Sequence, residues 1–131
     1  MSHTGTPTPP EAVDARFRAI ADHRRRFLLY YLREHGDATR RELADVLTGW
    51  LAAVTGSDAD ARGRERIHIA LQHVHLPKLE AEGFVSYDAD TGVVSVEAVP
   101  AWVDRCLDEA FRIEVATSEE PPQSLRDLVG G

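Results

Sequence analysis

The spacing of apolar residues changes at Gly83, and this change restricts the fold more than any other feature of the sequence. Before Gly83 the apolar residues follow a helical period over a segment that begins near residues 58–60. After Gly83, residues 84–97 alternate on both sides of a turn at Asp88 to Gly92, which predicts a two-stranded β-hairpin. We therefore expect a long helix, bent or interrupted by Pro77, that runs into a hairpin.

Shorter helices are predicted on both sides of this unit. The first ends before Asp22, which can cap the second, and the second stops at Gly36. The third has a predicted capping box, in which the Thr39 hydroxyl and the Glu42 carboxylate satisfy free backbone amides. A last helix of about residues 100–116 follows the hairpin.

These elements predict a single domain at residues 11–116, between flexible tails at 1–10 and 117–131 that are rich in Pro, Gly, Ser and Thr. The domain is mainly α with a small β-hairpin. Its order is three helices, a long helix, a hairpin at about 84–97 and a helix at about 100–116. That is the order of a winged helix-turn-helix, with the hairpin as the wing.

The overall charge is acidic and gives no sign of a nucleic-acid partner. Acidic residues number 22 against 15 basic ones, the net charge is -7, and Lys78 is the only lysine. Such a surface suits a cytoplasm of very high salt, so we interpret the chain as a halophile's protein. The alternative is an ordinary acidic protein with few lysines. In either case, any nucleic-acid site must be local.

Several function classes lack their signatures in this sequence. There is no run of about eighteen apolar residues and no secretory signal, so we expect a cytoplasmic protein. The single Cys106 excludes an internal disulfide and a zinc site built from several cysteines. No nucleophile turn, phosphate-binding glycine loop or dinucleotide fingerprint is present. We therefore expect no enzymatic activity and no cofactor.

Four motifs carry a resemblance to known regulators: HRRRFLLYYLRE, RRELAD, HVHLPKL and GFVSYDADTGVV. The chain resembles winged helix-turn-helix regulators of the ArsR type, and more closely a family of small haloarchaeal winged-helix domains of unknown function. The resemblance covers about residues 17–96. It implies a winged-helix fold and association with DNA. It implies no enzymatic activity, operator or effector, and the cysteine-bearing metal motif of arsenic-sensing relatives is missing from RRELADVLTGWL.

Three histidines in the long helix raise the question of a metal site. His68 and His75 point in similar directions on a helical wheel, but seven residues separate them by about 10 Å, too far for one ion. His73 falls on another side. Because helical zinc pairs need a spacing of three or four residues, we expect capping, packing or surface histidines and no metal. A ligand from a second subunit would be the alternative.

Arginine placement is the positive signal for DNA binding. Residues 61–79 hold four cations against the single carboxylate of Glu65, within a chain whose net charge is -7. In a winged helix this segment would meet phosphates at the edge of the major groove, where a guanidinium can pair bidentately with phosphate or guanine. The candidate phosphate-binding residues of this segment and of the preceding helix start are Arg40, Arg41, Arg62, Arg64, Arg66 and Lys78, and His73 is the candidate near a base edge. For Arg40 and Arg41, pairing with Glu42 or Asp45 is an equally good interpretation.

The long helix is apolar on two sides, which leaves a second function open. One face carries Ile67, Leu71 and Val74, and Ile69, Leu76 and Leu79 lie largely on the other. Unless Pro77 resets the phase, the exposed face is aliphatic and would suit a protein partner through Ile67, Leu71 and Val74.

An apolar stripe on the last helix predicts assembly. A core of three helices does not obviously need this stripe, so we expect it to pair with the first helix of a second copy in a homodimer. The expected contact residues are Phe17, Trp102, Cys106, Ala110 and Phe111.

Overall fold

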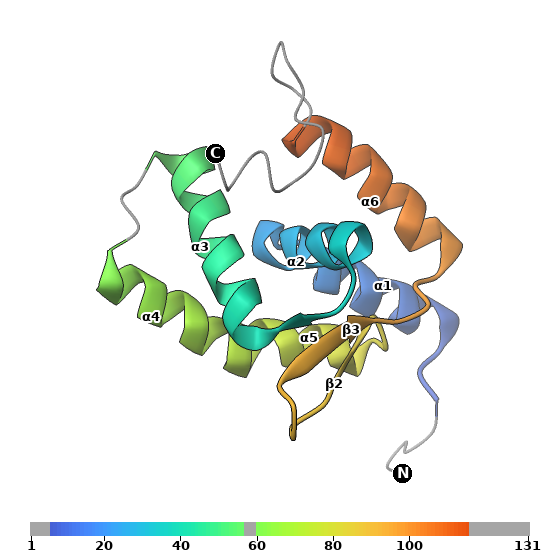
Figure 1. Cartoon of the computed structure of the whole chain (residues 1–131). Coiled ribbons are helices and arrows are strands. Elements are labelled where there is room, and N and C mark those ends of the chain that lie inside the picture. Colours follow the sequence, from blue (N-terminus) through green and yellow to red (C-terminus); the bar gives the residue numbers. More distant parts are fainter. Residues whose placement is uncertain (1–5, 57–59, 116–131) are drawn as a thin grey trace.

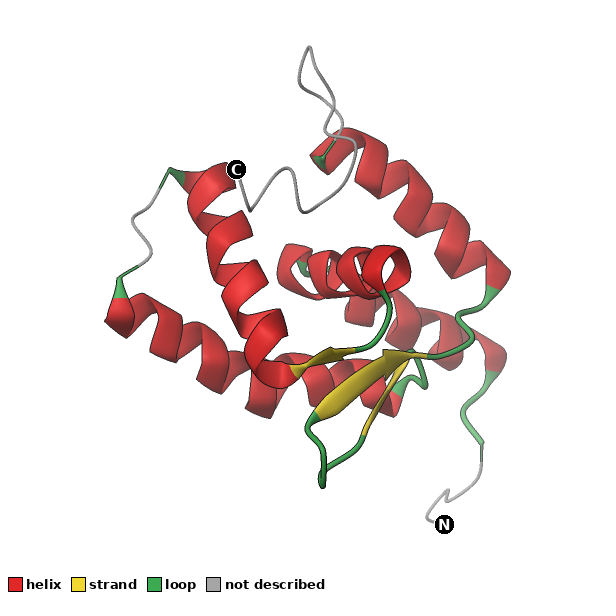
Figure 2. Cartoon of the chain, in the orientation of Figure 1, coloured by secondary structure: helices red, strands yellow, loops and turns green. Residues whose placement is uncertain are grey.

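The computed structural model describes residues 6–56 and 60–115 of the 131-residue chain, which are mainly helical with a small antiparallel sheet (Figures 1 and 2). The order of elements is α1 (Pro9–Ile20), α2 (His23–His35), β1 (Ala38–Thr39), α3 (Arg40–Thr55), α4 (Ala61–Ala70), the π-helical segment η1 (Leu71–His75), α5 (Leu76–Ala81), β2 (Val85–Tyr87), β3 (Val93–Val96) and α6 (Ala101–Glu114). The mainly α architecture and the succession of helices and hairpin are confirmed, and they are compatible with a winged-helix fold.

The hairpin lies within the expected range and gains a third strand that the sequence did not predict. β2 and β3 pair antiparallel, with Val85 opposite Val96 and Tyr87 opposite Val94. β1 pairs with the other edge of β3, so the strand order is β1-β3-β2 (Figure 2). A two-residue strand shows no alternation, and only its pairing with a distant strand defines it. The sheet therefore holds the start of α3 against the hairpin.

The helix ends follow local capping chemistry. Asp22 accepts the amide of Arg24 at 2.8 Å, and Gly36 ends α2 with a φ of 87°, both as predicted. The Thr39 hydroxyl accepts the Glu42 amide at 3.1 Å, but the reciprocal half of the predicted box is wrong. The Glu42 carboxylate instead accepts the Tyr31 hydroxyl at 2.7 Å, because α2 brings that buried ring within reach.

A complete capping box stands at the start of α1, where none was predicted. The Thr8 hydroxyl accepts the Glu11 amide, and the Glu11 carboxylate accepts the Thr8 amide. The helix therefore begins at Pro9, inside the segment 1–10 that was expected to be a tail. Residues 1–5 of that expected tail and the expected C-terminal tail at 117–131 lie outside the described residues.

The core forms around α2, which lies between α3 and α6 at the centre of the molecule (Figure 1). Every residue of α2 from Phe27 to Leu32 is buried, more than the single stripe expected from its helical period. Phe27 stacks on Trp50 of α3 with ring centroids 4.8 Å apart. The other fully buried large residues are Phe84, Leu43, Leu47, Leu71, Leu79, Leu107 and Val94.

Candidate nucleic-acid interface

The long helix is one structure in three parts: α4, the π-helical turn η1 and α5. In η1 the Leu76 amide donates to the Leu71 carbonyl five residues earlier. Pro77 follows directly and has no amide hydrogen for the His73 carbonyl, so the regular hydrogen-bond ladder cannot continue through this point. A π turn adds one residue to the turn, and it places both Leu71 and Leu76 against the core.

This turn determines which apolar residues of the long helix face the core and which face the solvent. Ile69 and Val74 point outward and are 49% and 44% exposed, whereas Leu71 is 0% exposed. The prediction that Leu71 contacts a partner protein is therefore wrong, because its side chain belongs to the core. Ile67 is half-buried. Of the expected partner-binding residues, Val74 is the one that is largely accessible.

The arginines of α4 are exposed to solvent. Asp60 caps the helix by accepting the Gly63 amide at 2.6 Å. Within residues 6–56 and 60–115, Arg62, Arg64 and Arg66 form no ion pair. Their positive charges are therefore available to a ligand.

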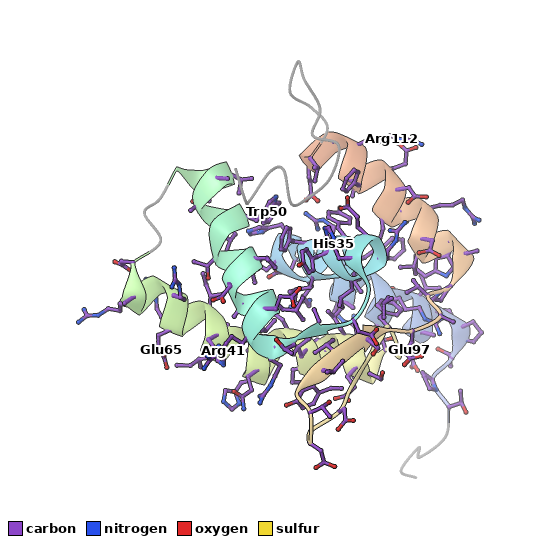
Figure 3. The ribbon with its side chains drawn as sticks, in the orientation of Figure 1. His35, Arg41, Trp50, Glu65, Glu97 and Arg112 are labelled. Atoms are coloured by element: carbon purple, nitrogen blue, oxygen red, sulfur yellow. The ribbon has the colours of Figure 1, made fainter. Side chains whose placement is uncertain are left out.

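These cations do not form the single strip that the sequence suggested. Arg64 lies with Arg41 and His68 around a hollow between α3 and α4, which Asp45 and Glu65 also line. Figure 3 shows Arg41 and Glu65 along the same lower edge of the molecule. A helix turns by about 100° per residue, so neighbouring arginines in the R-x-R-x-R pattern diverge.

Two further cations lie elsewhere around the long helix. Arg66 lines a different hollow, between α4 and the start of α2. Lys78 lies beside Arg18 and Glu82, where α5 meets α1. Arg66, Lys78 and the pair of Arg41 and Arg64 therefore lie in three separate hollows around the long helix. Arg41 with Arg64 is the one basic pair shared by α3 and α4 within the described residues.

Arg40 has an intramolecular partner, although a different one from the carboxylates considered above. Its guanidinium lies over the Tyr87 ring of β2 at 4.9 Å, a cation–π contact. Its amide donates to the Gly92 carbonyl at 3.1 Å. Arg40 therefore joins α3 to the hairpin. To contact a phosphate, its guanidinium would have to leave the Tyr87 ring. Arg41 forms no ion pair with Glu42 or Asp45.

The tip of the hairpin carries negative charge. The Asp88 carboxylate accepts the amides of Asp90 at 2.9 Å and Thr91 at 3.3 Å, so it is part of the turn itself. Asp90 is exposed beside it. Two carboxylates repel phosphate, so a nucleic acid on this surface would have to be held by helix residues and not by the hairpin tip.

The three histidines of the long helix have different environments. His73 is exposed on η1, His68 is half-buried on α4, and His75 is 4% exposed. The Arg25 guanidinium lies 3.3 Å from Nδ1 of His75 and also donates to the carbonyls of Ala19 at 2.7 Å and Arg18 at 3.0 Å. The described residues contain no group of three or more side chains that could hold a metal ion. Metal independence stays a prediction.

Burial lowers the pKa of His75, and the positive charges of Arg25 and Arg24 act in the same direction against the carboxylate of Asp22. The ring is therefore neutral near pH 7, with Nδ1 as the acceptor for Arg25. This pair was not predicted from the sequence. The signal was a run of three arginines at a helix start, where the macrodipole disfavours cations and another stabilising contact is needed.

The two other arginines of that run are also paired. Arg24 binds the Asp22 carboxylate at 3.1 Å, and the side-chain nitrogens of Arg26 donate to Glu114 at the end of α6. Tyr30 donates to the same carboxylate at 2.7 Å. This run therefore stabilises the fold and is not part of the candidate interface.

The surface expected to form a dimer is partly covered within one chain. Phe17 of α1 packs on Trp102 of α6 with ring centroids 4.9 Å apart, and Phe111 meets Tyr30 edge to face at 5.2 Å. Cys106 and Ala110 are half-buried between them along α6. Phe17 remains 49% exposed, and Ile113, which was not predicted, is 67% exposed.

These features describe a small, mainly helical protein in which a three-stranded sheet lies beside an arginine-bearing helix. The chain belongs to the DUF7344 family, a domain of unknown function, whose model matches residues 17–95. The match runs from α1 to β3 and includes the whole long helix. Neither the curated proteins nor the solved structures contain a match to this chain. No helix in the described ranges is long and apolar enough to span a bilayer.

Proposed function

We propose that this protein is a winged-helix regulator of transcription that binds DNA with α4, η1 and the start of α3. One observation carries the proposal: Arg41 of α3 and Arg64 of α4 are exposed, form no ion pair among the described residues and line one hollow, in a chain whose net charge is -7. Arginines that do not pair with carboxylates in an acidic protein forgo favourable ion pairs. Binding to a polyanionic ligand offsets this loss.

The arrangement of elements supports the same proposal. α3 and the long helix correspond to a helix-turn-helix, β2 and β3 to the wing, and β1 to the short strand that closes the sheet. The second helix of such a unit enters the major groove and the first crosses the backbone. Arg41 and Arg64 then face phosphates, and His73 lies closest to base edges. The resemblance to ArsR-type regulators and haloarchaeal winged-helix domains agrees with this assignment.

Fluorescence anisotropy with labelled genomic fragments tests the proposal directly. Arg64→Ala should weaken binding to all sequences and reduce the slope of log affinity against log salt by about one contact. Arg105→Ala is the matched control, because Arg105 is equally charged and exposed but lies on α6. His73→Ala should change sequence preference more than total affinity. If folded protein binds no fragment at low or high salt, the proposal is wrong.

A second candidate function rests on Ile69 and Val74, which are both exposed on the long helix. Exposed aliphatic side chains suit a thymine methyl group, but they also suit a protein partner. In the second case the protein is an interaction module, arginine substitutions leave DNA binding unaffected, and Val74→Asp abolishes a protein contact without unfolding the chain.

A further inference from the structure

A hollow of about 500 Å³ lies between the start of α2, one face of α3 and the inner side of α4. This volume is within the range of sites that bind small molecules. Leu47 and Leu51 of α3 and Ile67 of α4 supply an apolar wall. The hollow is separate from the group of Arg41 and Arg64, which lies around the other side of α4.

The polar groups of this hollow are basic. His23 and Arg24, the first two residues of α2, line it on one side, and Arg66 of α4 and His75 of η1 line it from the long helix. No aspartate or glutamate is among the described residues that line it, although the chain has 22 acidic residues. The amino end of α2 adds a partial positive charge from its dipole.

Arg66 is the cation of this set that has no ion-pair partner among the described residues. The Arg24 guanidinium is bound by Asp22 at 3.1 Å, and the buried His75 is neutral near pH 7. Arg66 forms no ion pair within the described ranges. The nearby Asp60 carboxylate already accepts the Gly63 amide at 2.6 Å as the cap of α4. A guanidinium beside an apolar wall complements a carboxylate joined to an apolar body.

We propose that this hollow binds a small organic carboxylate, with the carboxylate on Arg66 and the apolar body against Leu47, Leu51 and Ile67. An inorganic anion would leave the apolar wall in contact with water, and a neutral apolar molecule would leave Arg66 unpaired. The site joins α4 to α2 and α3, so an occupant holds α4 at a defined distance from the core. If α4 binds DNA, as proposed above, the ligand therefore also changes how α4 presents Arg64 to the phosphates.

Isothermal titration calorimetry without DNA tests the site independently of the proposed function. The probes are phenylacetate, its neutral isostere phenylacetamide, and acetate, which lacks the apolar body. We expect saturable binding of phenylacetate, and binding weaker by about tenfold for each of the other two. Arg66→Gln should remove the preference for phenylacetate over phenylacetamide. Arg64→Gln is the matched control, because it changes the same charge on the other side of α4 and should leave the preference intact.

Three results would overturn the site: no saturable binding of phenylacetate below about 10 mM, equal binding of the amide, or an equal effect of the two arginine substitutions. The link to DNA is measured separately, as the anisotropy of a DNA complex with and without phenylacetate. If phenylacetate weakens DNA binding by the wild type but not by Arg66→Gln, the link is supported. Unchanged binding overturns the link and leaves the carboxylate site supported by calorimetry.

Discussion

At the scale of single residues, a buried arginine and a buried histidine connect three helical segments behind the candidate DNA-binding surface. Arg25 is 8% exposed and joins the end of α1 to His75 on η1. A buried guanidinium needs several acceptors, and here two carbonyls and an imidazole nitrogen supply them. A protonated imidazole has no acceptor nitrogen, so the contact between Arg25 and His75 depends on His75 staying neutral.

The first prediction concerns pH. The pKa of His75 is lower in the folded protein than in the unfolded chain, so the unfolded state takes up a proton first as the pH falls. Stability from neutral His75 is complete above the unfolded pKa of about 6.5 and decreases below it, until the pH passes the folded pKa. Urea titrations at pH 7 and pH 5 should show a decrease in the free energy of unfolding, and His75→Gln should reduce this decrease.

The titration of Asp22 does not interfere with that measurement, because it falls below pH 5. Burial alone would raise its pKa, but the side-chain and backbone hydrogen bonds from Arg24 lower it to about 2. Its contribution is therefore complete above the unfolded value of about 4 and decreases only below it. If His75→Gln shows the same decrease between pH 7 and pH 5 as wild type, the assignment to His75 is wrong.

At the scale of elements, the π turn decides which residues of the long helix face the core. Leu71 and Leu76 are five residues apart, a spacing that separates side chains widely on a regular α-helix. Both are nevertheless buried, and Val74 between them is exposed. The accessible face of the helix is therefore different from the face that an unbroken helical period predicts.

The second prediction compares two substitutions on this helix. Leu71→Asp places a carboxylate in the core without a partner and should cost more than about 3 kcal/mol, enough to unfold much of the protein. Val74→Asp lies at a largely exposed position and should change stability by about 0.5 kcal/mol or less. Thermal melts followed by circular dichroism would measure both. If the two variants lost similar amounts of stability, the assignment of Leu71 to the core and of Val74 to the surface would be wrong.

The third prediction concerns how α6 is held. The Glu114 carboxylate accepts hydrogen bonds from Arg26 and Tyr30 of α2, and burial and this carboxylate raise the pKa of Tyr30. Glu114→Ala leaves Arg26 half-buried without its partner and should cost about 2 kcal/mol in urea denaturation. Glu109→Ala removes a pair that is exposed on both sides and should cost less than about 0.5 kcal/mol. Equal effects would contradict an anchoring role for Glu114.

At the scale of the whole molecule, α1 and α6 carry three of the exposed large apolar side chains of the described residues. Phe17 and Trp102 contact each other within one chain, yet Val13, Phe17 and Ile113 keep more than a third of their surface exposed. A homodimer would cover these side chains and would present two copies of α4 to successive half-sites on DNA. The contact within the chain and the contact between chains are compatible.

The fourth prediction is that the protein is a dimer at micromolar concentration in high salt, because salt screens repulsion between two acidic chains while apolar contacts persist. Light scattering should give twice the mass of one chain. Phe17→Ser should shift the equilibrium to monomer, and Val54→Ser, an equally exposed aliphatic position on α3, should leave it unchanged. A monomeric wild type would rule the dimer out.

The sequence by itself determined the elements whose causes are local. Asp22, Gly36 and Thr39 cap helices through neighbouring backbone groups, and the alternation on both sides of Asp88 to Gly92 predicts the pairing of β2 with β3. The sequence also contains the signal of the capping box at Thr8 and Glu11, but the proline-rich composition of residues 1–10 predicts a tail, and this prediction is wrong where α1 begins.

Only the tertiary structure decided the features that depend on residues far apart in the chain. β1 exists because β3 pairs with it, the Glu42 carboxylate turns to Tyr31, and Arg25 reaches His75 across fifty positions. The sequence located the basic segment, but the turn of α4 and the packing of three helices divided its charges among separate surfaces. Local periodicity specifies which residues prefer burial, and packing against distant elements selects the face that each side chain finally occupies.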